Sequence, residues 1–160
     1  MVDAQGNKIP LYKDLRILSK AGAVLILVMF FLPWFSHAGF PYSPHSRYLS
    51  DFWGANFSGF QLIWISSRIV QGAFVVFLPL VPLLWLTIIT LIEEEFNVLR
   101  RFSIIGLIVS IAFAGYVAFR SDMLFGEWIG HVQIPYFAII ALYVFMIVVT
   151  HRGTVRDDIY

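Results

Sequence analysis

The stretch AFVVFLPLVPLLWLTIITLI-EEEFNVLRR-FSIIGLIVSIAFAGYVAF, residues 73–119, decides the fold. Two apolar runs, 73–92 and 102–119, flank the charged link 93–101. A helix of about 20 apolar residues is roughly 30 Å long, which matches the hydrocarbon core of a bilayer. Because the nine residues of the link are too few to cross back through lipid, the two helices are predicted to be antiparallel neighbours. Their link then lies on one side of a membrane.

The composition of the whole chain agrees with a membrane protein. Hydrophobic residues make up 59% of the 160 residues, charged residues make up 13%, and the mean hydropathy is +0.80. Soluble domains contain about 45–50% apolar and about 25% charged residues. The sequence has no cysteine, which excludes disulfides and thiolate metal sites. We therefore predict a single membrane domain, 1–160, without a separate soluble domain.

Two further apolar spans complete the predicted fold. They lie at about 17–35 and 132–150. The four spans predict an all-α integral membrane four-helix bundle with up-down topology. Residues 36–72 are predicted to form an ordered outer cap. Within this cap, Ser58 and Gln61 have the spacing of a capping box, which predicts an interfacial helix or one continuous helix into the second span.

The positions of the basic residues predict the orientation. If both termini are cytoplasmic, eight of the eleven basic residues lie inside, which agrees with the positive-inside rule. Four of the five tryptophans then fall in or beside the outer segments, where indoles prefer the half-hydrated interface. We expect a bacterial cytoplasmic membrane. The eight residues are Lys8, Lys13, Arg16, Lys20, Arg100, Arg101, Arg152 and Arg156, and the tryptophans are Trp34, Trp53, Trp64 and Trp128.

The sequence carries no motif for catalysis. From Ala21 onward, the four apolar spans contain no Asp, Glu, Lys, Arg or His. Proton-coupled pumps, ion channels and intramembrane proteases need such groups at mid-membrane. Glycine-rich nucleotide loops and the His-Glu-x-x-His motif are also absent. We therefore predict no catalytic residues, no metal site and no nucleic-acid partner.

Two patterns within the spans concern helix packing. Pro79 and Pro82 predict a kink in the second span, which could shape the bundle or expose carbonyls to a ligand. In the third span, small residues recur at every fourth position and predict a seam where another helix approaches closely. That helix could belong to this chain or to a partner. The seam consists of Gly106, Ser110, Ala114 and Ala118.

Two histidines are the candidate cofactor ligands. His37 follows the outer end of the first span and His131 precedes the fourth span. Adjacent in an up-down bundle, they could share a metal or each ligate a haem or chlorophyll-type pigment. The alternative is that both histidines bond water or backbone carbonyls at the interface. The cofactor is thus unknown, and quinone or lipid also remains open.

A short pattern carries a family resemblance. Phe31-Leu32-Pro33-Trp34-Phe35 ends the first span, and Ser58-Gly59-Phe60 follows in the outer loop. This arrangement resembles small bacterial tetraspan membrane proteins of largely unassigned function. The layout, with a long first and a short second outer loop, is loosely similar to claudins, although the paired loop cysteines of claudins are absent. The resemblance implies no functional residues.

Two classes of function follow from these patterns. The first is a non-catalytic accessory subunit of a larger membrane complex, respiratory or photosynthetic, with other integral membrane subunits and lipids as partners. Its contacts would involve the outer cap and the Gly106 to Ala118 face. The second is a ligand-handling protein. It would bind haem or pigment through His37 and His131, or carry a small apolar molecule at the Pro79 and Pro82 kink.

Overall fold

The computed structural model describes residues 14–36, 56–62, 80–120 and 125–157, which are mostly helical, as the predicted all-α class requires. A two-stranded sheet, which the sequence analysis did not predict, joins the helices at one end. The elements in chain order are α1 (Leu15–Phe31), β1 (Pro33–Ser36), β2 (Asn56–Ser58), α5 (Leu80–Ile92), α6 (Phe96–Arg120), α7 (Phe125–Ile129) and α8 (Ile134–Asp157).

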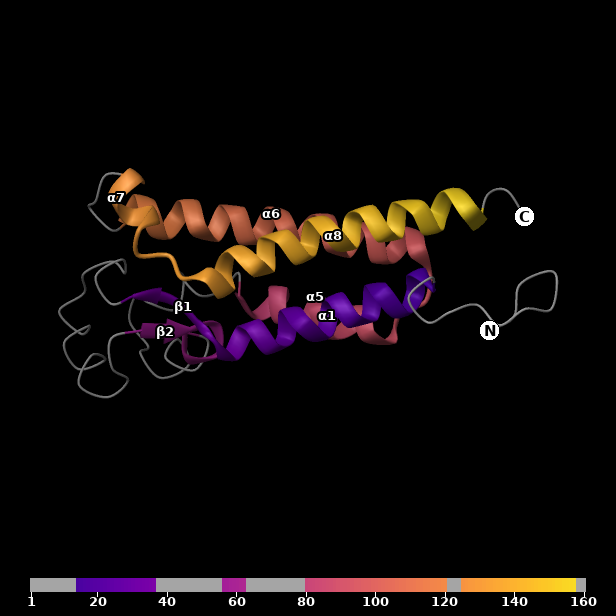
Figure 1. Ribbon diagram of the computed structural model, residues 1–160, viewed down its shortest axis with the longest axis horizontal. Coiled ribbons are helices and arrows are strands. Elements are labelled where there is room, and N and C mark those ends of the chain that lie inside the picture. Colours follow the sequence, from indigo (N-terminus) through magenta and orange to yellow (C-terminus); the bar gives the residue numbers. More distant parts are fainter. Residues whose placement is uncertain (1–13, 37–55, 63–79, 121–124, 158–160) are drawn as a thin grey trace.

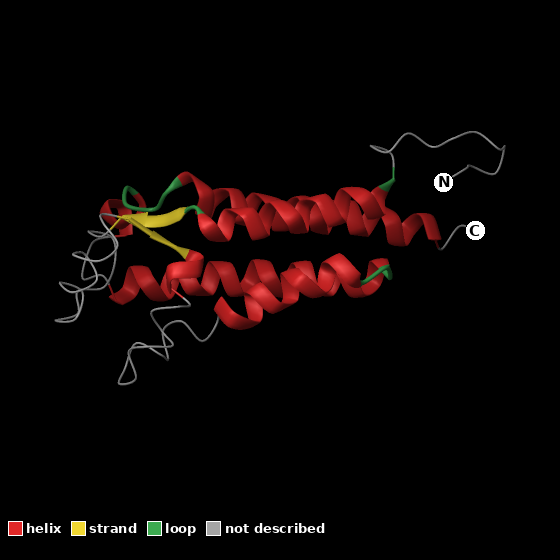
Figure 2. Ribbon diagram, turned by 90° about the horizontal axis from the view of Figure 1, so that it is seen from below, coloured by secondary structure: helices red, strands yellow, loops and turns green. Residues whose placement is uncertain are grey.

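The four longer helices lie side by side. Contacts join α6 to α8, α8 to α1, α1 to α5 and α5 to α6, so the helices close a ring around one core. Figure 1 shows β1, β2 and α7 together at one end, which we call the sheet end. The start of α1 and the end of α8 lie at the opposite end, which we call the link end because α5 connects to α6 there. Figure 2 shows the same division from below.

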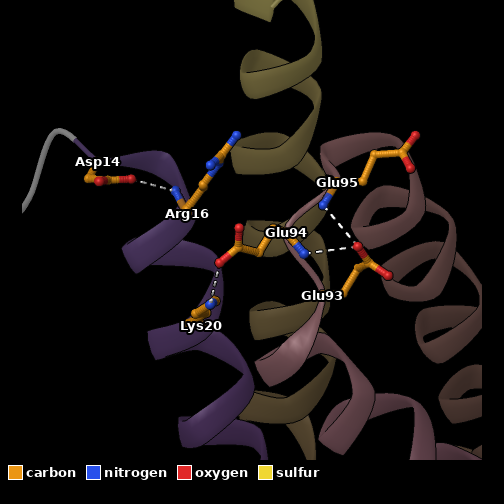
Figure 3. A network of polar contacts seen from close by, with 6 residues as sticks. All are labelled: Asp14, Arg16, Lys20, Glu93, Glu94 and Glu95. Carbon is orange, nitrogen blue, oxygen red and sulfur yellow. Dashed lines mark hydrogen bonds and ion pairs between the residues drawn. The ribbon is translucent and has the colours of Figure 1, made fainter. Parts of the chain in front are cut away.

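The link between α5 and α6 is shorter than predicted. Helix α5 ends at Ile92, as expected, but α6 already begins at Phe96, so the link is Glu93–Glu95 rather than 93–101. The Glu93 carboxylate accepts hydrogen bonds from the amides of Glu94 at 2.9 Å and Glu95 at 3.0 Å (Figure 3). A carboxylate bonded to amides at a helix start is favourable, because helix N-termini carry unpaired N–H groups and a positive dipole end.

A second contact at the link end ties α1 to the link. The Lys20 ammonium lies 3.8 Å from the Glu94 carboxylate, and Asp14 caps α1 by accepting a hydrogen bond from the Arg16 amide at 3.0 Å (Figure 3). The guanidinium of Arg16 lies over the ring of Phe96, 5.5 Å from its centroid. The link end is therefore held by polar contacts around a buried aromatic ring.

The first predicted span, 17–35, was wrong at its far end. Helix α1 stops at Phe31, and residues 33–36 form β1 instead. Leu32 has φ −87° and ψ 156°, as expected of a residue before proline, where the Cδ group of the proline disfavours the helical conformation. The strand pairs antiparallel with β2, with Pro33 opposite Ser58.

The later spans are longer than predicted. Helix α6 begins before the expected residue 102, and α8 runs beyond the expected residue 150. Phe96 and Gly153, in these two extensions, pack against each other and continue the core beyond the apolar runs. Residues 73–79 of the second span, with most of the outer cap, fall outside the described residues.

Buried positions along the helices alternate three and four residues apart. This spacing is that of helices packed at a small crossing angle with interlocking side chains. The predicted seam follows a strict interval of four instead, and its members Gly106, Ser110 and Ala118 are buried whereas Ala114 is half-buried. The buried stripe of α6 is Phe96, Leu99, Ser103, Gly106, Ser110, Phe113 and Val117, and that of α8 is Tyr136, Ile139, Tyr143, Met146, Thr150 and Gly153.

Tyr143 joins three helices at the centre of the bundle. Its ring lies so close to Gly106 of α6 that a Cβ atom there would come 2.6 Å from Tyr143 Cζ. Its hydroxyl lies 2.8 Å from the hydroxyl of Thr87 on α5. Thr87 itself donates to the backbone oxygen of Leu83 at 2.8 Å, so the Tyr143 hydroxyl is the donor. The missing side chain of Gly106 thus allows α8 to reach α5.

We expect Gly106→Ala to lower the free energy of unfolding by about 1–3 kcal/mol, because the added methyl group overpacks the Tyr143 ring. Gly115→Ala is the matched control on the same helix, since a Cβ there would meet nothing within 4 Å. This control should be neutral or stabilising by up to about 1 kcal/mol. Unfolding in detergent micelles, followed by circular dichroism, measures both; equal stability of the two variants would refute the close contact.

The link predicts an acid-sensitive contribution to stability. The amides of Glu95 and Glu94 hold the pKa of Glu93 below its ordinary value of 4.5. The ionised carboxylate therefore stabilises the fold above that pH, and this contribution is lost as the pH falls through the lowered pKa. Glu93→Gln should flatten the loss of thermal stability between about pH 5 and pH 3. Glu95→Gln, which removes the same charge but not the capping carboxylate, should leave the slope in place.

Candidate functional site at the sheet end

The two parts of the family-like pattern meet at the sheet end. Pairing of β1 with β2 brings Trp34 against Gly59, where a Cβ atom would lie 2.5 Å from Trp34 Cη2. The Trp34 side chain is 0% exposed, and its indole N–H donates to the backbone oxygen of Met29 at 2.8 Å. The Pro-Trp and Ser-Gly steps are therefore two sides of one packing contact.

The predicted capping box is present beside this contact. The Ser58 amide donates to the Gln61 side chain at 2.8 Å, and the Gln61 amide donates to the Ser58 hydroxyl at 3.2 Å. A helix begins at Gly59 and is described as far as Leu62. The box orients the chain so that Gly59 faces the indole. The remainder of the predicted interfacial helix lies outside the described residues.

A group of rings surrounds Trp34, and we call it the aromatic cluster. Trp34 lies edge-on to Phe30 and Tyr136, with ring centroids 4.7 Å and 5.2 Å away. Phe35 continues the group, with centroids 5.0 Å from Tyr136 and 5.8 Å from Trp128. Edge-on and tilted pairs add attraction beyond the area they bury. The cluster, from α1, β1, α6, α7 and α8, is Phe30, Trp34, Phe35, Phe113, Trp128 and Tyr136.

The chain around His131 is fixed to β1. The His131 Nδ1 atom lies 2.9 Å from the Ser36 hydroxyl, and the His131 backbone oxygen accepts the Ser36 amide at 2.9 Å. Two residues later, the Gln133 amide donates to the backbone oxygen of Trp34 at 2.7 Å. The bond at Nδ1 orients the imidazole ring and agrees with both interpretations of His131, since ligating histidines ordinarily carry such a bond on their second ring nitrogen. His37 lies outside the described residues, so its expected proximity to His131 remains a prediction.

The predicted seam faces a helix of this chain. Gly106 lies against Tyr143, and the Ser110 backbone oxygen accepts the Tyr136 hydroxyl at 2.5 Å. Ala118 is buried, whereas Ala114 is half-buried. Helix α8 of this chain therefore packs on the seam at Gly106 and Ser110. Contact of the Gly106 to Ala118 face with a partner subunit stays a prediction.

Pro82 is exposed in the first described turn of α5. Pro79 and the kink predicted near 75–78 lie outside the described residues. The ligand site that was proposed at this kink therefore remains a prediction.

An apolar pocket of about 230 Å³ lies beside the aromatic cluster, and we call it the sheet-end pocket. Its walls come from α6, α7, the start of α8 and the turn between them. The sequence analysis missed this pocket because isolated aliphatic and aromatic residues carry no chemical signature. The one sequence feature that could have indicated open space there is Gly115, which follows the seam residue Ala114 and has no side chain. The lining residues are Ile111, Ala114, Gly115, Trp128, Ile129, Val132, Tyr136, Phe137 and Ile140.

Gly59→Ala should destabilise the sheet end by about 1–3 kcal/mol, because a methyl group would overlap the buried indole. The variant should also shift the summed tryptophan emission to longer wavelength, as Trp34, one of five tryptophans, is displaced toward water. Gly126→Ala is the control at the same end, since a Cβ atom there would meet nothing within 4 Å. Unchanged melting and emission in Gly59→Ala would contradict the indole contact.

The side chains at the sheet end are suited to close packing and to binding an apolar ligand. Within residues 14–36, 56–62, 80–120 and 125–157, no group of three or more His, Asp or Glu side chains could hold a metal ion. The Tyr136 hydroxyl is already bonded to a backbone oxygen. Comparison of the chain with protein-family models, curated proteins and solved structures returns no match.

Proposed function

We propose that this chain is an integral membrane four-helix bundle that serves as a non-catalytic accessory subunit of a larger membrane protein complex. The observation that carries the proposal is the apolar outer surface of all four long helices. Exposed side chains include Val28 of α1, Trp85 of α5 at 63%, Ile108 of α6 at 59% and Val144 of α8. Soluble monomers rarely expose large contiguous apolar patches, so such a surface suits lipid or other membrane helices.

Helix length supports the same location. Phe96–Phe119 and Ile134–Thr154 are each long and apolar enough to cross a membrane, and Leu80–Ile92 is a shorter apolar helix. Between Ala21 and Phe31 of α1, and between Phe102 and Phe119 of α6, no residue is charged. The described parts of α5 and the first seventeen residues of α8 share this property. Charges at such depths would be costly in lipid.

The core contains buried hydroxyl groups among its apolar side chains. The buried hydroxyls of Ser103, Ser110 and Thr150 each donate to the backbone oxygen four residues earlier, at 2.7 to 2.8 Å. Such bonds satisfy hydroxyl groups without water. In lipid, where no water is available, this internal pairing is required.

The charge at the link end supports the orientation. Lys20, Arg100, Arg101 and Arg152 lie at or next to this end. The positive-inside rule favours the cytoplasm for it and the outer side of a bacterial cytoplasmic membrane for the sheet end. Both termini would then be cytoplasmic.

An accessory role agrees with the hydrogen bonding of the hydroxyl groups inside the bundle. The described hydroxyls within the bundle are largely committed to backbone bonds, whereas exposed apolar side chains cover the outside. Partner helices would contact these outer faces. A bioenergetic complex, respiratory or photosynthetic, is the class we propose. Haem or pigment binding through His131 is the alternative, in which the bond from Ser36 at Nδ1 would orient the ring and Nε2 would be the ligand atom.

Purification from native membranes in mild detergent tests the accessory role. We expect integral membrane proteins to copurify in fixed stoichiometry, with identities that mass spectrometry would reveal. A monodisperse solitary protein would contradict the role. The absorption spectrum of the same fraction tests the alternative, since a visible band lost in His131→Phe would favour a haem or pigment protein.

A further inference from the structure

We infer that the sheet-end pocket binds one hydrocarbon tail of a membrane phospholipid, an inference that rests on the proposed membrane location. The nine lining residues are aliphatic or aromatic apart from glycine, so the walls offer mainly dispersion and hydrophobic contact. The Tyr136 hydroxyl is not available to a polar ligand in the pocket, because it donates to the backbone oxygen of Ser110. The occupant is therefore an apolar segment without a polar head inside the pocket.

The size of the pocket favours a linear chain over a ring. Sites for drug-sized molecules usually measure about 300–1,000 Å³, whereas this pocket measures about 230 Å³. A haem or chlorophyll-type macrocycle is too large for such a volume. A flexible alkyl chain can adapt to it, because the chain is narrow and its rotamers conform to the walls.

The pocket opens on the apolar surface of the bundle. Its rim residues Ile111 and Phe137 are 54% and 46% exposed, and they belong to the two helices long enough to cross a membrane. Tyr136 and Trp128 form a buried floor. Gly115 leaves the entrance wide, since a Cβ atom there would meet nothing within 4 Å. A lipid tail can thus enter sideways from the surrounding bilayer.

The depth of the pocket matches a lipid anchored at the outer interface. The chain next to it contains the Ser36 to His131 hydrogen bond and the exposed carboxylate of Glu127. In the proposed orientation these polar groups would lie at the level of the lipid headgroups, next to the pocket residues Trp128 and Val132. The rim is continuous with the surface that we propose faces lipid, so the occupant that we propose is a phospholipid tail.

Photolabelling tests this site. The full-length protein would be reconstituted in vesicles of phosphatidylethanolamine and phosphatidylglycerol that contain phosphatidylcholine with a diazirine in one acyl chain. Mass spectrometry would then locate the label. We expect more label on pocket residues than on Ile104 and Ile105, which are exposed on the same helix but do not line the pocket.

Gly115→Leu should lower labelling of the pocket about fourfold or more, because the new side chain displaces at least one methylene contact. Ala112→Leu is the control, since Ala112 is exposed on the same helix and does not line the pocket. Circular dichroism checks that both variants remain helical. Equal labelling of pocket and control positions in the unmodified protein, or no effect of Gly115→Leu, would overturn the site.

Two further measurements separate the alternatives. An isoprenoid quinone with a diazirine in its tail, used in the same vesicles, should label the pocket less than the phospholipid does; preferential quinone labelling would overturn the phospholipid assignment. Extraction with alkaline carbonate tests the membrane location itself. Release of the protein would refute the proposed function, whereas retention without pocket labelling would refute only the lipid site.

Discussion

The close approach of α6 and α8 at Gly106 is the constraint on which the rest of the structure depends. Because Gly106 has no side chain, the Tyr143 ring lies directly on α6 and its hydroxyl reaches Thr87 of α5. One residue thereby fixes the spacing of three helices. One heptad earlier on α8, Tyr136 meets α6 in the same register and bonds to Ser110. That register places Tyr136 in the aromatic cluster and, with it, the floor of the sheet-end pocket.

Different interactions stabilise the two ends of the bundle. At the sheet end, close packing fixes the arrangement of the strands. The Trp34 indole lies against Gly59, where a Cβ atom would overlap the ring. At the link end, exposed polar contacts add to the packing of Phe96 against Gly153, because Glu93 accepts the Glu94 and Glu95 amides just before α6 and Lys20 pairs with Glu94. Both devices place polar groups at the ends of the helices, and an uncharged apolar surface covers the part between. This division agrees with the proposed membrane location of the bundle.

The sequence predicted the hairpin best, because apolar length and a charged link are local signals. The end of α5 at Ile92 and the Ser58 to Gln61 box were confirmed for the same reason. The end of α1 was wrong, since the apolar run continues past Phe31 although Pro33 disfavours a helix at Leu32. The pocket could not be predicted, because its walls depend on which helices become neighbours.

The membrane-spanning bundle is the central claim, and cysteine accessibility tests it most directly. The chain has no cysteine, so each substitution introduces a single thiol. Glu95→Cys at the link, Glu127→Cys in α7 and Ile108→Cys midway along α6 would be treated with a membrane-impermeant maleimide in intact cells and after lysis. We predict labelling of the Glu127 variant in intact cells, of the Glu95 variant only after lysis, and of the Ile108 variant in neither condition. Equal labelling of all three positions after lysis, with none in intact cells, would contradict a bundle that crosses the membrane.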